Sequence, residues 1–280
     1  MRITLGDLSF DALAAGPEAG EPVLLLHGWP EFADCWRPIM QALAAAGYRA
    51  VAVDQRGYSP GARPLDVIDY AMDRLVADAL GFADQLGWAT FHLVAHDWGG
   101  MVAWTLAGAH PDRLRSLSVL ATPHPVALST EAAADEAQYH RLDYIRFFRR
   151  PGGVAEAALL ADGAARLRAA YSGNIPPALM EANAERLSRP GALTATLNWY
   201  RAVADDLAVP AGRITTPTLY IWGDQDAALG AGAARRTADY VDATYRFCIL
   251  EGKSHWLPEQ APDEIAPLLL DHLSACERRL

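Results

Sequence analysis

The sequence has few cysteines, few basic residues and no long apolar run, and each shortage excludes a class of protein. The three cysteines, Cys35, Cys248 and Cys276, are scattered without a CxxC spacing, so we expect neither a disulfide framework nor a zinc site. Thirty-four acidic residues against twenty-four basic ones give a formal charge of -10, which disfavours nucleic acid and anionic membrane surfaces as partners. No apolar stretch is long enough to cross a bilayer or to act as an export signal. We therefore expect a soluble, cytoplasmic protein.

Cofactor motifs are absent as well. Neither GxGxxG nor GxxxxGKS/T occurs in the chain, so we expect no nucleotide cofactor, and no spacing of ligand residues predicts a metal. The 280 residues, of which 51% are hydrophobic and 21% charged, are enough for a large buried core. Because no cofactor or metal is expected, any chemistry must come from the side chains of the protein itself. The composition leaves the oligomeric state open, a homodimer included.

The chain does contain a regular alternation of short apolar runs and helical stretches. Besides an N-terminal hairpin, the predicted strands cover residues 23–26, 49–54, 91–96, 114–121, 217–223 and 244–250. The predicted helices cover residues 32–46, 70–86, 101–110, 231–241 and 262–278. Continuous apolar runs of this length are typical of strands covered on both faces. The alternation predicts an α/β fold with a mostly parallel sheet flanked by helices.

One long segment interrupts this alternation. Between residues 122 and 210 no strong strand pattern occurs, and Ala, Glu, Arg and Leu dominate. We interpret this segment as a helical insertion into the α/β core. The predicted domains are therefore a core formed by residues 1–122 and 211–280, and a helical cap at residues 123–210.

The segment VAHDWGG, residues 94–100, has the strongest local signal. A predicted buried strand runs into Asp97 and then directly into a helix, with small residues two positions before and after it, at Ala95 and Gly99. This spacing is what a sharp strand-to-helix turn needs to hold a nucleophile at the sheet edge, although the usual pattern has Ser at its centre and Gly at its first small position. An Asp at a helix start is also a common N-cap, so Asp97 alone leaves both interpretations open.

Two further signals follow the last two predicted strands. WGDQD, residues 222–226, stands at the end of the strand predicted over 217–223, and GKSHW, residues 252–256, follows the strand predicted over 244–250. The order Asp97, then Asp224 or Asp226, then His255 is the chain order nucleophile, acid, base of the α/β-hydrolase pattern. Three matches in this order favour a catalytic Asp97 over a plain helix cap.

On these motifs the sequence resembles the epoxide hydrolases of the α/β-hydrolase fold, with the haloalkane dehalogenases as near relatives. The resemblance extends over nearly the whole chain. HGWPEF at 27–32 is similar to the family's HGxP oxyanion loop, DQRGYS at 54–59 to its D-x-R-G-x-S turn, and AHDWGG at 95–100 to its nucleophile elbow. In the family pattern WGxxD the acid is the second Asp, which implies Asp226, and GKSHW implies His255 as the base.

The resemblance implies a role for each of these residues. Asp97 attacks a carbon of the substrate and forms an alkyl ester, which splits one slow displacement by water into two easier steps. His255 activates the water that hydrolyses the ester, and Asp226 orients the ring of His255. The backbone N–H groups of Trp29 and Trp98 form the oxyanion hole.

The predicted cap supplies candidate proton donors. A carboxylate nucleophile suits an sp3 carbon, because attack on a carboxylic ester would give an anhydride, so the leaving group is a ring oxygen or a halide. LDYIRFFRRPG and LNWYRAV resemble the family's two lid segments with an acidic tyrosine, which implies Tyr144 and Tyr200. An epoxide oxygen needs such a donor. Packing is the alternative role for any tyrosine here, since the cap also contains Tyr139 and Tyr171.

The expected function is an epoxide hydrolase that adds water to a hydrophobic epoxide and gives a vicinal diol. The alternatives are a haloalkane dehalogenase with the same nucleophile and a non-catalytic ligand-binding protein. Trp29 stands where many dehalogenases have Asn, which favours the epoxide. We expect His27 to brace the oxyanion loop and His96 to pack beneath the elbow. The aromatic side chains predicted to wall the cleft are Trp29, Phe32, Trp98, Phe147, Phe148, Trp199 and Trp256.

Overall fold

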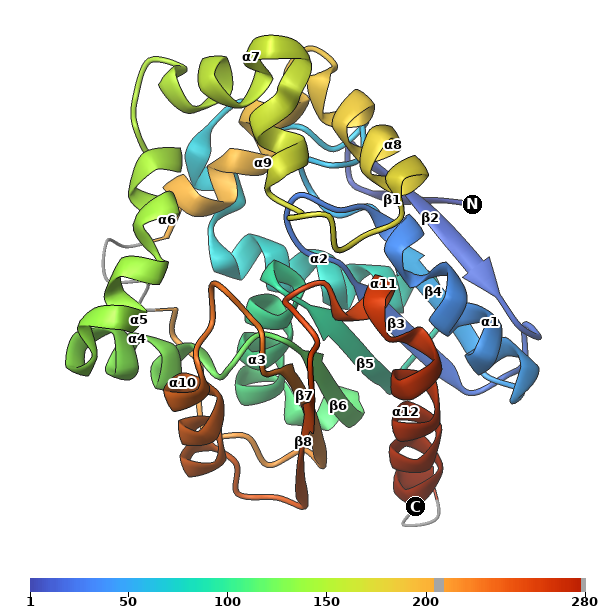
Figure 1. Cartoon of the computed structure of the whole chain (residues 1–280). Coiled ribbons are helices and arrows are strands. Elements are labelled where there is room, and N and C mark those ends of the chain that lie inside the picture. The colour runs from blue at the N-terminus through green and yellow to red at the C-terminus, as the bar shows by residue number, and fades with distance from the viewer. Residues whose placement is uncertain (204–208, 278–280) are drawn as a thin grey trace.

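A sheet of eight strands runs through the computed structural model, which describes residues 1–203 and 209–277. The strand order is β1-β2-β4-β3-β5-β6-β7-β8 (Figure 1). The strands are β1 Arg2–Leu5, β2 Leu8–Ala15, β3 Pro22–Leu26, β4 Arg49–Val53, β5 Phe91–His96, β6 Leu114–Leu120, β7 Thr218–Gly223 and β8 Tyr245–Leu250. β2 pairs antiparallel with β1 and β4, and every other pairing is parallel. The mostly parallel sheet is confirmed, and the N-terminal segment, predicted as an edge strand or a hairpin closed at 16–22, forms a hairpin that turns between Leu5 and Leu8.

The helices of the core cover both faces of this sheet. They are α1 Arg37–Ala45, α2 Met72–Gln85, α3 Trp98–Ala109, α10 Ala231–Arg236, α11 Leu257–Gln260 and α12 Pro262–Glu277. Successive residues of β3 point to opposite faces: Leu24 packs in the cluster with α2 and α3, and Leu25 packs in the cluster with α1 and α12. Because both faces are buried, the central strands are continuous apolar runs.

Some helix boundaries differ from the prediction. The helix predicted over 32–46 begins with a 3-10 turn, and α1 starts only after it, because Pro38 has no N–H and fits only in a first helical turn. The helix predicted over 231–241 is α10 followed by a 3-10 turn. The single turn α11 is absent from the sequence prediction. The predicted last residue of the closing helix, Arg278, lies outside the described residues.

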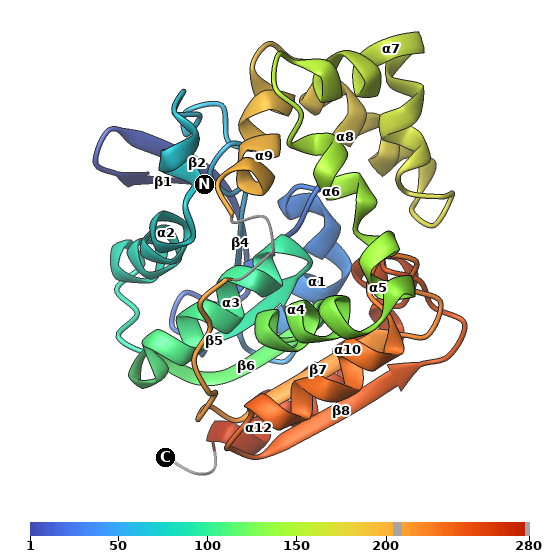
Figure 2. The ribbon, with the colours of Figure 1, turned by 90° about the vertical axis from the view of Figure 1, so that its left-hand side faces the viewer.

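The described residues between β6 and β7 form helices, of which the first lies beside α10 and the later ones lie over the carboxyl edge of the sheet (Figure 1, Figure 2). They are α4 Pro125–Ala134, α5 Glu136–Arg141, α6 Asp143–Phe148, α7 Val154–Ala169, α8 Pro177–Ser188 and α9 Ala192–Arg201. The described residues of this segment contain no strand, as predicted. Residues 204–208 lie outside the described part, and the domain boundaries at 123 and 210 stay a prediction.

The described residues contain neither a membrane-spanning helix nor a disulfide bond. No helix within 1–203 or 209–277 combines the length and the apolar character needed to cross a bilayer. The three cysteines all lie in the described part, and none is in a disulfide bond. Burial raises the pKa of the Cys35 thiol well above its usual value, so Cys35 stays protonated at neutral pH.

Candidate active site

Asp97 stands at the turn between β5 and α3, at the carboxyl edge of the sheet. Its backbone angles, φ 51° and ψ -122°, lie in a region that non-glycine residues rarely adopt. The packing around the turn is tight: a Cβ at Gly99 would lie 2.4 Å from the carbonyl oxygen of Leu26, and a Cβ at Gly28 would lie 2.2 Å from the Asp97 Cβ. Only glycine fits at these two positions, which explains the small residues of the motif.

His255 lies between Asp97 and Asp226 and contacts each of them through one ring nitrogen. Nε2 is 3.2 Å from Oδ2 of Asp97, and Nδ1 is 2.7 Å from Oδ2 of Asp226. Asp97 follows β5, His255 follows β8 and Asp226 follows β7. The carboxyl ends of these parallel strands share one edge of the sheet. The side chain of Asp226 is fully buried, and those of His255 and Asp97 are 10% and 15% exposed. The structure therefore brings together the three residues predicted as nucleophile, base and acid.

Asp226, rather than Asp224, is the carboxylate that faces His255. Its Oδ1 accepts hydrogen bonds from two backbone N–H groups of its own loop, at 2.8 and 2.9 Å, which leaves Oδ2 for the imidazole. Asp224 instead accepts from the backbone N–H of Gly252 at 2.8 Å. From the cap, Arg141 donates to the carbonyl oxygen of Asp226 at 3.0 Å. The position of the acid therefore depends on α5 as well as on the core.

The two carboxylates set the protonation of His255. Burial alone would lower the pKa of His255, but Asp226 and Asp97 outweigh it and raise this pKa well above its ordinary value. Burial would likewise raise the pKa of Asp97, but the hydrogen bond and charge of His255 outweigh it and lower this pKa. At neutral pH the resting site thus pairs an imidazolium with an ionised Asp97. The ionised carboxylate is the form needed for nucleophilic attack.

The HGWP loop supplies a hydrogen bond to the predicted nucleophile. The backbone N–H of Trp29 donates to Oδ1 of Asp97 at 2.7 Å. His27 braces the loop, because its Nδ1–H donates to the carbonyl oxygen of Gly28 at 2.9 Å and its Nε2 accepts from the backbone N–H of Gln55 at 3.2 Å. The side-chain amide of Gln55 donates to the carbonyl oxygen of His27 at 2.6 Å. These contacts match the bracing role predicted for His27.

Trp98 is the second predicted oxyanion donor. It is the first residue of α3, so its backbone N–H has no acceptor within the helix. The next backbone N–H, that of Gly99, donates to the carbonyl oxygen of His27 at 3.1 Å and holds the start of α3 against the HGWP loop. Both predicted oxyanion donors therefore lie beside Asp97.

Tyr144 on α6 and Tyr200 on α9 line the same cavity as Asp97. Their ring centroids are 6.1 Å apart, and the ring of Tyr200 packs edge-on against Trp98 at 4.9 Å. Burial is the main cause that raises the pKa of Tyr144, and the charge of Asp97 adds to it. Burial is also the main cause that raises the pKa of Tyr200, and Tyr144 and Asp97 add to it. Both phenols are protonated at neutral pH and can donate a proton. Arg149 donates to the carbonyl oxygen of Tyr200 at 2.7 Å and so joins the ends of α6 and α9.

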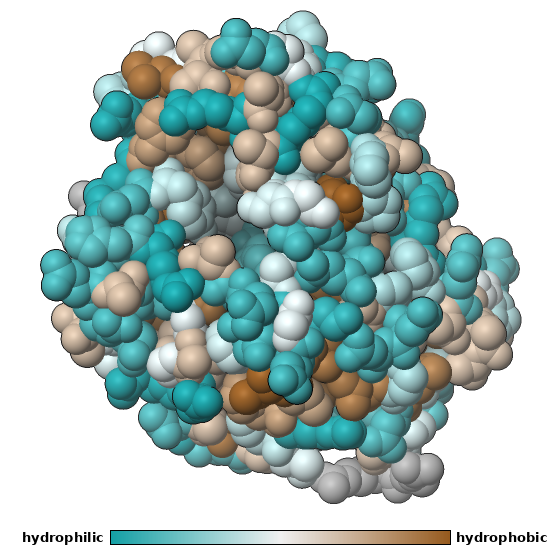
Figure 3. Space-filling view, in the orientation of Figure 1, coloured by the Kyte–Doolittle hydropathy of each residue, from teal (hydrophilic) through white to brown (hydrophobic). Residues whose placement is uncertain are grey.

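A cavity of about 400 Å³ lies next to Asp97, and Figure 3 shows the surface recessed between the cap and the core. Trp29, Phe148 and Trp256 line this cavity as predicted, and Trp98 lines a smaller neighbouring one. Uncharged polar side chains that the sequence prediction lacks also line it: Ser172, Asn174, Gln225 and Ser254. These four residues lie in loops, where no periodic pattern could indicate them.

Phe32, Phe147 and Trp199 do not line either cavity, contrary to the prediction. The indole N–H of Trp199 donates to the carbonyl oxygen of Arg56 at 2.8 Å, and the guanidinium of Arg186 covers the ring of Phe32 at 3.5 Å. Sequence patterns indicate which side chains are buried, but they do not show which neighbour each one meets.

Behind His255, His96 connects the active site to a buried pair of carboxyl groups. Nε2–H of His96 donates to the carbonyl oxygen of His255 at 2.8 Å, and Nδ1 lies 3.0 Å from Oε2 of Glu31. Burial and then the charge of Glu31 raise the pKa of Glu259 well above its usual value. Burial would also raise the pKa of Glu31, but its interactions with Glu259 and His96 outweigh burial and lower this pKa. Glu259 therefore keeps its proton beside the ionised Glu31.

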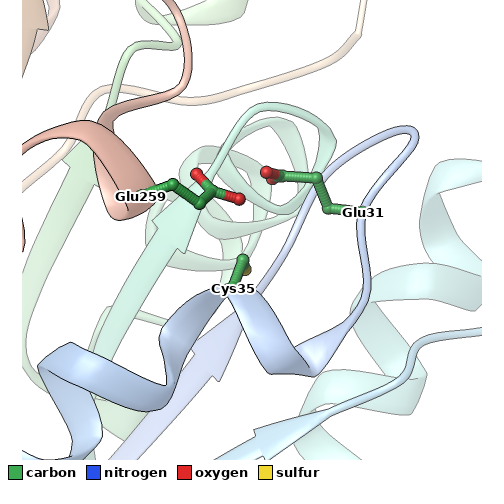
Figure 4. A group of neighbouring side chains, drawn as sticks. All are labelled: Glu31, Cys35 and Glu259. Atoms are coloured by element: carbon green, nitrogen blue, oxygen red, sulfur yellow. The ribbon is translucent and has the colours of Figure 1, made fainter. Parts of the chain in front are cut away.

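Cys35 adds a thiol to this pair (Figure 4). Ligand-type atoms of Glu31, Cys35 and Glu259 lie within 4.8 Å of one another, so these three side chains could hold a metal ion. The proton on Glu259 removes one of the two buried negative charges without a metal. None of the three side chains lines either cavity. Sequence reasoning missed this cluster, because Glu259 lies far along the chain from Glu31 and Cys35.

The chain is similar to known proteins over nearly its whole length. Residues 21–262 match the family model for the alpha/beta hydrolase fold. Epoxide hydrolase 4 of Mus musculus is 35% identical, and the match covers 100% of this chain and 80% of that protein. Epoxide hydrolase A of Mycobacterium tuberculosis is 34% identical, and the match covers 94% of both chains. The solved structure of an epoxide hydrolase from an endophytic Streptomyces is 30% identical with a TM-score of 0.84, and the match covers 99% of this chain and 96% of that one.

Proposed function

Because the chain belongs to the epoxide hydrolases of the alpha/beta hydrolase fold, we propose that it adds water to an epoxide through an ester on Asp97 and releases a vicinal diol. The observation that carries the proposal is the line of contacts from Asp97 through His255 to Asp226, beside a cavity that Tyr144 and Tyr200 also line. One site then contains a nucleophile, a base, an orienting acid and two proton donors.

In the first step Asp97 attacks a ring carbon of the epoxide. The ring C–O bond breaks, its electron pair goes to the epoxide oxygen, and Tyr144 or Tyr200 donates the proton that completes a hydroxyl group. The attacking oxygen is Oδ2, because Oδ1 accepts a hydrogen bond of 2.7 Å from the oxyanion donor Trp29, whereas the contact of Oδ2 with His255 is longer, at 3.2 Å. Ester formation removes the negative charge of Asp97, which is one cause of the raised pKa of both tyrosines. The phenols therefore become stronger acids as the alkoxide develops.

In the second step His255 must be neutral to accept a proton from water. The imidazolium first returns a proton to the tyrosinate, and the ester favours this transfer because the charge of Asp97, which helped to raise the pKa of His255, is gone. His255 then takes a proton from water, whose oxygen attacks the carbonyl carbon of the ester. The N–H groups of Trp29 and Trp98 hold the oxyanion. When the intermediate collapses, the C–O bond to the substrate breaks and the departing alkoxide takes the proton from His255. The carboxyl group left on Asp97 then gives its proton to His255, so the diol leaves a carboxylate beside an imidazolium.

The two phenols favour an epoxide over a halide as the reacting group. An epoxide oxygen leaves as an alkoxide and needs a proton, whereas a halide leaves as a weakly basic anion and needs none. Protonated Tyr144 and Tyr200 beside Asp97 fit the first requirement. A haloalkane is therefore the alternative substrate that a test must separate from an epoxide.

Intact mass spectrometry of the His255→Gln variant makes this separation. Without the base, the ester on Asp97 should persist after incubation with styrene oxide. A gain equal to the whole mass of the epoxide is expected, because ring opening expels no atom. A gain only with 1-bromohexane, equal to the haloalkane minus hydrogen bromide, would overturn the proposal, as would no gain with any epoxide. The matched control adds Asp97→Asn to the same variant and should gain no mass.

Three further properties belong to the proposal. The cap at 123–210 covers a core formed by 1–122 and 211–280, the enzyme acts in the cytoplasm, and it acts alone or as a homodimer. Its partners are a small hydrophobic epoxide and water, without nucleic acid or membrane. Limited proteolysis, cell fractionation and light scattering of the purified protein test the first three properties separately.

A further inference from the structure

The space around Asp97 is divided into two unequal compartments. The wide compartment is the cavity of about 400 Å³, and a narrow compartment of about 30 Å³ lies next to it. Asp97, Tyr144 and Tyr200 line both of them, so the nucleophile and the two proton donors stand at the boundary. An epoxide held by these three groups directs the substituents of its two ring carbons into different compartments.

Packed aliphatic side chains line the narrow compartment. They are Met101, Leu128, Leu142, Ile145 and Leu229, each at most 6% exposed. The hydroxyl of Thr122 also lines this compartment, but it donates to the carbonyl oxygen of Asp97 at 2.9 Å. A volume of about 30 Å³ is far below that of a cavity on the order of 150 Å³, which holds benzene. The narrow compartment therefore admits a hydrogen atom or a methyl group and rejects a ring.

The wide compartment fits a bulky, uncharged substituent. Three aromatic side chains line it, Trp29, Phe148 and Trp256, together with uncharged polar side chains from loops. Among its described lining residues, only Asp97 and His255 carry a charge. Both are already paired with each other, so a charged substituent would lose its hydration without gaining an ion-pair partner.

We infer that the enzyme hydrolyses terminal epoxides with one bulky, uncharged, largely apolar substituent, and that it discriminates against epoxides whose second ring carbon bears a group larger than methyl. The inference rests on the proposed function, since it assumes attack by Asp97 and protonation by Tyr144 or Tyr200. The aliphatic side chains of the narrow compartment are then the residues that determine specificity.

A series of epoxides with one constant phenyl group tests the inference. Styrene oxide, trans-β-methylstyrene oxide, trans-2-phenyl-3-propyloxirane and trans-stilbene oxide differ only in the second substituent. We expect the kcat/KM values of the epoxides with hydrogen and with methyl as the second substituent to lie within about tenfold of each other. For the epoxide with phenyl at this position, kcat/KM should be at least about 100-fold lower than for styrene oxide. Comparable kcat/KM for styrene oxide and trans-stilbene oxide would overturn the inference and leave epoxide hydrolysis standing. Formation of no diol from any of the four would remove the proposed function and the inference together.

Two variants locate the selectivity in the narrow compartment. Leu128→Ala enlarges it, and Ile145→Val removes a single methyl group and so disturbs folding less. Both should raise kcat/KM for the propyl epoxide relative to styrene oxide, Leu128→Ala by about tenfold. Leu159→Ala is the matched control, because Leu159 on α7 is 5% exposed against 4% for Leu128 but lines neither compartment. An unchanged ratio in both folded cavity variants would contradict the assignment of specificity to this compartment.

Discussion

The backbone N–H of Trp29 donates a hydrogen bond of 2.7 Å to Oδ1 of Asp97. Oδ2 of the same carboxylate lies 3.2 Å from Nε2 of His255, so the two oxygens occupy different environments before a substrate binds. Oδ1 already has the donor that an ester carbonyl and its oxyanion need, and Oδ2 is left for the attack on carbon. The resting site is thus preorganised for both steps of the proposed reaction.

A single turnover in water enriched in oxygen-18 should place the label on Asp97 and leave the diol unlabelled. Hydrolysis at the ester carbonyl gives the water oxygen to the carboxylate, and the diol leaves with the oxygen that attacked it. Mass spectrometry of the peptide with Asp97, after excess enzyme has consumed styrene oxide, measures the label. The peptide with Asp226 is the control and should stay unlabelled. Label in the diol of the first turnover would mean direct attack by water on the epoxide.

Replacement of either cap tyrosine should slow ring opening without slowing ester hydrolysis. Tyr144→Phe and Tyr200→Phe each remove one proton donor, and loss of a general acid reduces the rate by roughly 10²-fold. Rapid-quench measurements of ester formation and decay separate the two steps. Tyr139→Phe is the matched control, because Tyr139 lies in the same cap but is 48% exposed. Equal slowing of both steps would show that the tyrosines serve packing instead.

Asp226→Asn should move the pH profile of ester hydrolysis to lower pH. Burial opposes protonation of His255, and the charge of Asp226 is the main cause that raises its pKa. Since the base works only when neutral, the wild-type rate rises with pH through this raised pKa, and loss of the charge lowers the midpoint. The plateau should also fall by roughly 10²-fold, because the amide orients the ring less well.

Single-turnover decay of the ester between pH 5 and pH 10 measures both effects of Asp226→Asn. Asp224→Asn is the control, since Asp224 contacts the N–H of Gly252 and not His255. This control should keep the wild-type midpoint and plateau. A midpoint that stays in place after Asp226→Asn would contradict the assigned role of the carboxylate.

Glu259→Gln should stabilise the protein relative to the wild type as the pH rises. Folding raises the pKa of Glu259 above its value in the unfolded chain. The stability that the bound proton contributes is therefore fully present at a pH below the pKa of the unfolded state. It is lost as the pH rises from there toward the pKa of the folded state. Gln has no charge at any pH, so it never places a second negative charge beside Glu31. The difference in free energy of unfolding should therefore grow by up to about 1.4 kcal/mol per pH unit above the unfolded pKa.

Urea denaturation at pH 5 and pH 8 measures this difference for Glu259→Gln. Glu251→Gln replaces an exposed carboxylate near α11 and serves as the control, with no change between the two pH values. A difference that does not depend on pH would show that Glu259 is ionised in the folded protein.

Much of the fold and part of the site follow from the sequence because their causes are local. The short apolar runs of β3, β5 and β7 predict strands buried on both faces, and the helical stretches between them require parallel crossovers. The strained turn at Asp97 needs small residues next to it in the chain, so its motif is visible in the order of the amino acids alone. His255 follows from its place after the last strand.

Tertiary packing alone decided which side chains meet across the elements. The pairing of Glu31 with Glu259, the failure of Trp199 to reach the cavity and the narrow compartment beside Leu128 all depend on contacts between segments distant in the chain. Motifs and periodicity fix the order of the elements and the turn that raises the nucleophile. The shape of the space around that nucleophile is the sum of many such contacts, and it exists only once the cap has packed onto the core.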